Sequence, residues 1–254
     1  MSPAAVPAKD WPYPLWIAHR GAGKLAPENT LAAFRLGASH GYRMFECDAK
    51  LSDDGVLFLL HDDTLERTTN GRGVAGAFPW TTLSQLDAGA WHSPDCAGEP
   101  LPTLVNIARY CLANGFCLNI EIKPTEGMER ATGRAVAQLA QRLWAEWPDA
   151  PTPLLTSFKP ESLSGAKEAV PQLRRGLLLE ELWPGWQATA TELGCQALIA
   201  HHPLWDPSLR EETRQLGLRA LAFTVNEPET VHRLLNLKLD GLITDRVDIF
   251  KPEG

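Results

Sequence analysis

The chain has 254 residues, 44% of them hydrophobic, so it can bury a large core in one barrel-sized domain or two smaller ones. Its 24 basic and 31 acidic residues give a formal net charge of −7, which argues against a general attraction to nucleic acid or anionic lipid. Any anion that the protein binds must therefore be held by local groups.

The cysteines and the N-terminal segment bear on the cellular compartment. The five cysteines are odd in number and scattered, and none forms a C-x-x-C pair, which fits a reducing compartment. The segment "MSPAAVPAKDWPYP" lacks the apolar core of a signal peptide, and no apolar run is long enough to span a bilayer. We expect a soluble cytoplasmic protein without membrane insertion, and the sequence gives no indication of its oligomeric state.

Short apolar runs, each suited to one buried strand, recur along the chain. They occupy residues 15–19, 43–48, 118–122, 154–158, 175–179, 197–201, 220–225 and 241–245. Segments with helical periodicity separate most of them, such as residues 28–41, 131–147, 208–217 and 227–238. This alternation indicates an α/β fold with a parallel sheet. One domain of eight units over residues 12–251 matches the size of a TIM (β/α)8 barrel, with a doubly wound open sheet as the main rival.

Polar residues at the ends of the predicted strands favour the barrel. They are His19, Glu46, Asp48, Glu121, Ser157, His201, Asn226 and Asp245. In a barrel the C-terminal strand ends converge on one mouth, where the active site lies. From about residue 62 to 104 the alternation is interrupted by glycine-rich and proline-rich sequence, which follows an extra hairpin, "GVLFLLHDD". We expect a small insertion here that lies over the mouth.

Three acidic residues at neighbouring strand ends predict a metal site. Glu46 and Asp48 are two residues apart in "ECDAKL" and therefore share one face of a strand. Without a cation between them, one of the two carboxyls would tend to stay protonated. With Glu121 of "IEIKP" they provide three carboxylate ligands, which suit Mg²⁺ first and Ca²⁺ second. The alternative is that these acids form salt bridges at the rim of the barrel.

Two histidines and two cations are expected beside these acids. His19 and His61 each follow an apolar strand, and a pair of imidazoles can act as acid and base near neutral pH. Arg20 and Lys123 add positive charge beyond that of a metal ion, which suggests an anionic substrate such as a phosphate. The alternative for these two cations is an ion pair with Asp62 or Glu46.

Two nearby motifs are interpreted as structural. The segment "APENT" is expected to begin a helix with Pro27 and Glu28 in its first turn, so Glu28 is left out of the metal site. The segment "GAGK" at residues 21–24 lacks the length and spacing of a P-loop.

In order along the chain, "HRG…PENT", "E-x-D", "HD", "IEIKP", "TVN" and "GLITDR" resemble the motifs of the glycerophosphodiester phosphodiesterase family. The resemblance runs from about Leu15 to Asp248 and is greatest to the cytoplasmic bacterial members. It implies a TIM barrel with a small insertion after the second histidine. It further implies a divalent metal on the three acids, an acid–base pair of His19 and His61, and phosphate contacts from Arg20 and Lys123. Phe223 departs from the tryptophan of many members, and the surroundings of His202 are less typical.

The resemblance implies hydrolysis of small glycerophosphodiesters, such as glycerophosphocholine and glycerophosphoethanolamine, to sn-glycerol 3-phosphate and an alcohol. Either histidine can be the acid, and the nucleophile can be water or the 2-hydroxyl of the substrate. The alternatives are a catalytically inactive metal-binding barrel and a hydrolase of another phosphodiester. A glycosidase also places paired carboxylates at a barrel mouth, but the flanking cations fit it poorly.

Overall fold

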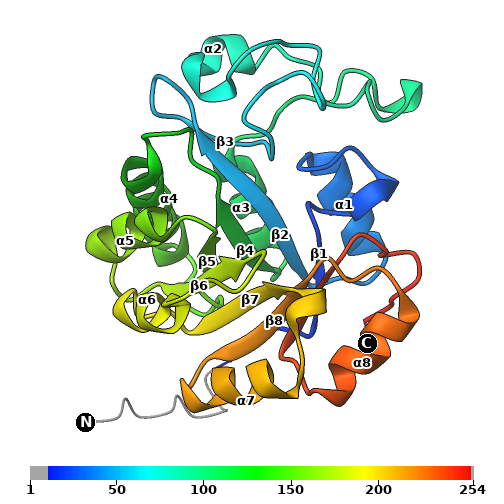
Figure 1. The fold of residues 1–254 in the computed structure, drawn as a ribbon. Coiled ribbons are helices and arrows are strands. Elements are labelled where there is room, and N and C mark those ends of the chain that lie inside the picture. Colours follow the sequence, from blue (N-terminus) through cyan, green and yellow to red (C-terminus); the bar gives the residue numbers. More distant parts are fainter. Residues whose placement is uncertain (1–10, 253–254) are drawn as a thin grey trace.

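The computed structural model describes residues 11–252 of the chain (Figure 1). Most of the segment used for the signal-peptide argument, residues 1–10, lies outside the described residues. Eight parallel strands of the described part form a closed barrel. They are β1 (Trp16–Ala18), β2 (Met44–Leu51), β4 (Cys117–Ile122), β5 (Leu154–Ser157), β6 (Arg174–Leu179), β7 (Ala197–His201), β8 (Arg219–Phe223) and β9 (Gly241–Thr244).

The strand order decides between the two expected α/β folds. Each strand pairs with its neighbours in the order β1-β9-β8-β7-β6-β5-β4-β2, and β1 also pairs with β2 through Ala18 and Phe45. Because the first strand has partners on both sides, the sheet has no open edge between them. The TIM barrel prediction is therefore confirmed, and the doubly wound open sheet is excluded.

Helices connect consecutive barrel strands and cover the outside of the barrel (Figure 1). They are α1 (Leu31–Ser39), α3 (Leu104–Ala113), α4 (Glu129–Ala145), α5 (Pro160–Ala169), α6 (Trp186–Glu192), α7 (Pro207–Gln215) and α8 (Pro228–Asn236). The Thr30 side chain caps α1 by accepting a hydrogen bond from the Ala33 N–H. The prediction for "APENT" was therefore wrong in one respect, because Pro27 and Glu28 precede the helix instead of forming its first turn.

No helix within residues 11–252 combines the length and the apolar character needed to cross a bilayer.

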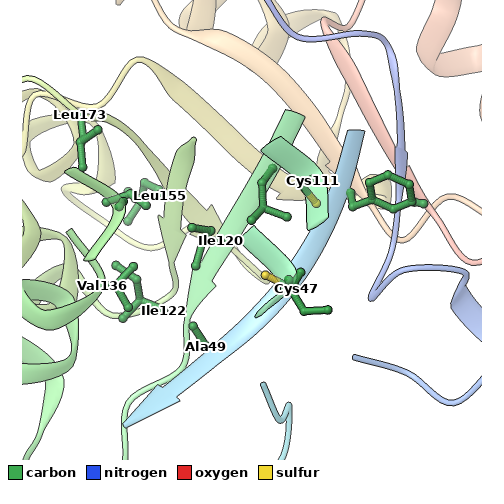
Figure 2. Packing of buried hydrophobic residues seen from close by; sticks show 14 of the residues in the cluster. Cys47, Ala49, Cys111, Ile120, Ile122, Val136, Leu155 and Leu173 are labelled. Carbon is green, nitrogen blue, oxygen red and sulfur yellow. The ribbon is translucent and has the colours of Figure 1, made fainter. Parts of the chain in front are cut away.

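The core has two layers, separated by the barrel wall. Outward-facing strand residues such as Ile120 and Ile122 pack against the helices (Figure 2), whereas Ile17, Met44 and Ile199 belong to a second cluster. Strand residues alternate between the two faces, so Glu121 points away from the helix-facing layer that holds its two isoleucine neighbours. This alternation explains the acidic residue in an otherwise apolar strand.

The predicted insertion is present between β3 (Leu57–Leu59) and α3. β3 pairs antiparallel with β2, as expected for the hairpin, and the insertion contains the short helix α2 (Trp80–Leu83), at the top of Figure 1. It has its own small core, which includes Phe58, Leu65 and Leu83. The insertion is joined to the loop after β1 by hydrogen bonds, among them one between His92 Nε2 and the Lys24 carbonyl oxygen at 3.1 Å.

Candidate active site

The three predicted metal ligands meet at the mouth of the barrel. Glu46 and Asp48 share one face of β2, and the register of β2 with β4 places Asp48 beside Glu121. One oxygen of each carboxylate can be chosen so that all three lie within 4.8 Å of one another. The three residues are only 3%, 1% and 9% exposed. The sequence prediction that these acids form one cluster agrees with this arrangement.

The cluster has the properties of a site for a hard divalent cation. Glu46 Oε1 and Glu121 Oε1 are buried and lack a hydrogen-bond partner among the described residues. Burial, Asp48 and Glu121 raise the pKa of the Glu46 carboxyl well above its ordinary value, and burial and Asp48 raise the pKa of Glu121 to about 8. Both shifts reflect negative charges brought together out of water. A divalent ion bound by the three oxygens would remove this conflict.

Asp48 is the member of the cluster that keeps its charge. Burial acts against ionisation, but Arg20, His61 and Lys123 outweigh it, so the pKa of Asp48 is lowered. Asn29 fixes this carboxylate by donating from Nδ2 to Asp48 Oδ2 at 2.8 Å and accepting from the Asp48 N–H at 3.1 Å. The Asp48 carboxylate is therefore charged and oriented before any ion binds.

His19, which follows β1, lies between an acid of the cluster and a second carboxylate. Its Nδ1 is 2.7 Å from Asp245 Oδ1, and its Nε2 is 3.8 Å from Glu46 Oε2. Asn226 donates to the other oxygen of Asp245 at 2.9 Å. Burial raises the pKa of Asp245, but His19, the hydrogen bond from Asn226 and the charge of Arg20 together outweigh it, and the pKa falls to about 2. The charged Asp245 carboxylate accepts a hydrogen bond from the Nδ1–H group of His19. The other ring nitrogen, Nε2, therefore faces the acidic cluster.

His61, which follows β3, is arranged in a similar way. Its Nδ1 is 2.7 Å from Asp62 Oδ1, and its Nε2 is 3.2 Å from Lys123 Nζ. Burial lowers the pKa of His61, and the positive charges of Arg20 and Lys123 lower it further against the pull of Asp48. Lys123 Nζ is also 3.5 Å from Glu121 Oε1. The neutral imidazole therefore shares a lysine with the third acid of the cluster.

Arg67 of the insertion connects the supports of His61 and Arg20. Its guanidinium makes two hydrogen bonds to Asp62, of 2.6 and 2.9 Å, and two of 2.8 Å to Glu28. Glu28 in turn accepts a bond of 2.8 Å from Arg20. Each carboxylate therefore receives a pair of hydrogen bonds from the guanidinium, an arrangement that fixes its orientation. The insertion thus orients groups on two sides of the acidic cluster.

The alternative ion pairs considered for the two cations were wrong. Within the described part of the chain, Arg20 pairs with Glu28 at 2.8 Å and Asp48 at 3.3 Å, and Lys123 pairs with Glu121. Arg20 touches Glu46 only through its main-chain N–H, at 3.0 Å from Oε2. Both cations therefore border the acidic cluster itself.

The fold and the geometry match a known family. A sequence model of the glycerophosphoryl diester phosphodiesterase family matches residues 19–249. The chain belongs to this family. A glycerophosphodiester phosphodiesterase of Caldanaerobacter subterraneus subsp. tengcongensis is 34% identical over 241 residues, which cover 91% of this chain and 93% of the relative. The resemblance drawn from the sequence motifs, and with it the assignment to an enzyme family, is confirmed.

Solved structures of the family have the same fold. A phosphodiesterase of Oleispira antarctica, in complex with the product sn-glycerol 3-phosphate, is 35% identical with a TM-score of 0.85, covering 91% of this chain and 93% of that one. A glycerophosphodiester phosphodiesterase of Agrobacterium tumefaciens str. C58 is 28% identical with a TM-score of 0.79, covering 94% and 99%.

In this member of the family, a cavity of about 270 Å³ opens beside the acidic cluster. His19, His61, Glu46 and Glu121 line it together with an apolar group that includes Phe223. The Phe223 ring meets the Phe158 ring edge-on at a centroid distance of 5.6 Å. The residue that departs from the family's usual tryptophan therefore lies in the wall of the cavity, where it shapes the space available to a ligand.

Several residues of this family member's site were not predicted for the roles that the geometry suggests. Asp245 and Asn226 were placed at strand ends, and the motifs "GLITDR" and "TVN" contain them, so a signal was present. Asp62 was considered only as an ion-pair partner, although it adjoins His61 in the "HD" motif. Nothing in the sequence pointed to Arg67. Of the other strand-end residues, Ser157 is buried and donates to the Ile122 carbonyl, outside the acidic cluster.

Proposed function

We propose that the protein hydrolyses glycerophosphodiesters, such as glycerophosphocholine and glycerophosphoethanolamine, to sn-glycerol 3-phosphate and an alcohol. One observation carries the proposal: two histidines, each hydrogen-bonded through Nδ1 to a carboxylate at 2.7 Å, flank a buried cluster of three acids. The family membership and the product complex of the Oleispira antarctica relative support the choice of substrate.

The proposed cofactor is one divalent cation, Mg²⁺ in preference to Ca²⁺, held by Glu46, Asp48 and Glu121. The buried Glu46 Oε1, which has no hydrogen-bond partner among the described residues, and the all-oxygen donor set support this assignment. When bound, such an ion supplies positive charge that polarises a phosphate oxygen. Asn29 and Arg20 keep Asp48 charged and oriented, so one of the three ligands is in place before the ion binds.

Arg20 and Lys123 are proposed to bind the substrate phosphate. Each already contacts an acid of the cluster, at 3.3 Å for Arg20 with Asp48 and 3.5 Å for Lys123 with Glu121. A phosphate at the cluster would therefore lie within reach of both cations. Their charges would stabilise the negative charge that builds on its oxygens during the reaction.

His19 and His61 are proposed as the acid–base pair. One imidazole takes the proton of the nucleophile, and the other gives a proton to the departing alkoxide. Asp245 and Asp62 hold the Nδ1 side of each ring, so that Nε2 carries the proton transfer in both. The hydrogen bond from Lys123 keeps His61 Nε2 directed toward the acidic cluster.

The test of these roles is to measure release of glycerol 3-phosphate from glycerophosphocholine by wild type, His19→Ala and His61→Ala. The expected loss is at least about 100-fold in kcat for each variant, with metal affinity retained. His232→Ala, an exposed histidine on α8, is the matched control and should keep full activity. Undiminished turnover in both site variants would overturn the acid–base assignment, and no product from wild type with any divalent ion would favour an inactive barrel.

We also propose that the reaction takes place in the cytoplasm. All five cysteines are free, and Cys47, Cys111 and Cys117 are buried, as expected for a protein kept in a reducing compartment. Fractionation of cells expressing the tagged full chain tests this proposal. Recovery of the protein outside the cytoplasmic fraction would contradict it.

A further inference from the structure

A second cavity, of about 410 Å³, adjoins the proposed catalytic site. His19 and Arg20 line both this cavity and the one beside the acidic cluster. The far wall consists of Trp91 and His92 of the insertion and of Gly23 and Lys24, the end of the "GAGK" segment that the sequence left without a role. A phosphodiester with its phosphorus near His19 and Arg20 has two ester arms, and each arm has a cavity to enter.

The walls of this second cavity are fixed by contacts within the protein. Trp91 Nε1 donates to the Ala88 carbonyl at 2.9 Å, and the indole meets the His92 ring edge-on at 5.7 Å. His92 reaches across to the Lys24 carbonyl. At Gly23, with φ +58°, a Cβ would lie only 2.2 Å from the Asp245 Cα. The loop after β1 therefore packs directly against the backbone of Asp245, the residue that contacts His19. The cavity is thus a built feature of the fold.

The charges around the cavity are paired with one exception. The Glu28 carboxylate is hydrogen-bonded to Arg20 and Arg67. The Asp245 carboxylate is hydrogen-bonded to His19 and Asn226. The Lys24 ammonium is exposed and has no hydrogen bond or ion pair in the part of the chain that the structure describes. The cavity therefore offers a free cation and no free carboxylate, together with the face of a tryptophan that is 39% exposed.

We infer that this cavity receives the alcohol half of the substrate and selects an uncharged polyol, such as glycerol, over a quaternary ammonium alcohol, such as choline. Hydroxyl groups can accept hydrogen bonds from Lys24, and the carbon face of a polyol can lie on Trp91. A quaternary ammonium has no donor or acceptor for Lys24. Repulsion by the Lys24 charge also opposes the attraction of the Trp91 face for a cation, which is weak at an exposed site. The inference rests on the proposed function, because it requires a phosphodiester at His19 and Arg20.

The experiment compares kcat/KM for glycerophosphoglycerol and glycerophosphocholine in wild type, Lys24→Glu and Trp91→Ala. Wild type is expected to prefer the glycerol substrate. Lys24→Glu should shift the ratio toward the choline substrate by about fivefold, because the repulsion becomes an attraction at an exposed site. Trp91→Ala should lower kcat/KM for the glycerol substrate by about tenfold. The controls are Arg72→Glu, an exposed charge reversal elsewhere on the insertion, and Trp147→Ala, a tryptophan 41% exposed just after the C-terminus of α4.

Inhibition by sn-glycerol 3-phosphate shows which half of the substrate the cavity holds. This product lacks the alcohol half, so its inhibition constant should stay within about twofold of wild type in both variants. Weaker inhibition in Lys24→Glu and Trp91→Ala would place the glycerol phosphate half in the cavity and overturn the inference. An unchanged substrate ratio in Lys24→Glu would overturn it as well. Failure of the proposed function has a different signature, namely no turnover of either substrate by wild type. That result would overturn both the proposed function and the inference on the second cavity.

Discussion

Binding of a divalent ion to the acidic cluster should release protons, because the pKa values of two of its three carboxyls, Glu46 and Glu121, are raised. A carboxyl whose pKa is about 8, as for Glu121, is protonated in about nine-tenths of the molecules at pH 7. The pKa of Glu46 is raised in the same direction, whereas that of Asp48 is lowered. Since a bound metal requires ionised carboxylates, we expect Glu121 to release about one proton per ion at pH 7, and the raised pKa of Glu46 acts in the same direction.

Calorimetric titration of the metal-free protein with Mg²⁺ or Ca²⁺ measures this release. The observed enthalpy, plotted against the ionisation enthalpy of several buffers at one pH, has the number of protons as its slope. Raising the pH above 8 should reduce the Glu121 contribution toward zero. In Glu121→Gln the release should fall by about one proton and the affinity should weaken, while Glu161→Gln, an exposed carboxyl on α5, should match wild type. An enthalpy that does not depend on the buffer at pH 7 would show that the Glu121 carboxyl is already ionised.

Three further predictions concern the supports of the site and the fold. Asp245→Asn removes the charge that holds His19, so kcat should fall by at least about tenfold while KM and metal affinity change little; an unchanged kcat would count against this role. Arg67→Lys keeps the charge but cannot form two planar pairs of hydrogen bonds, so kcat should drop about tenfold while the melting temperature stays close to that of wild type. Gly133→Ala places a Cβ 1.9 Å from the Ser162 carbonyl oxygen and should destabilise the protein by about 1–3 kcal/mol in urea unfolding, whereas an unchanged midpoint would show that α4 and α5 can move apart.

The barrel and the acidic cluster were predictable because both depend on local patterns. Buried parallel strands appear as short apolar runs, and the two-residue period of a strand puts Glu46 and Asp48 on one side. Parallel pairing of the next barrel strand, β4, with β2 then brings Glu121 beside Asp48 without further information. Each step uses only neighbouring residues and the general geometry of the fold, so the three acids could be placed together from the sequence.

The loops around the cluster were harder to predict because they depend on unusual backbone conformations and long-range contacts. Arg20 and Asn29 have φ values of +49° and +59°, a region that side-chain-bearing residues seldom adopt. A left-handed Asn29 cannot be part of an α-helix, so α1 begins only at Leu31, and Glu28 lies before it and accepts hydrogen bonds from Arg67. Arg67 is 39 residues away along the chain from Glu28, and no periodic pattern connects the two.

The most direct test of the account is turnover of glycerophosphocholine by one preparation of the protein before metal removal, after it, and after Mg²⁺ or Ca²⁺ is restored. We predict release of sn-glycerol 3-phosphate by the loaded protein, loss of at least about 100-fold of the rate on removal, and recovery on restoring the ion. A variant with Glu46, Asp48 and Glu121 all changed to the corresponding amides should not recover. Turnover that survives both metal removal and this triple change would contradict the account.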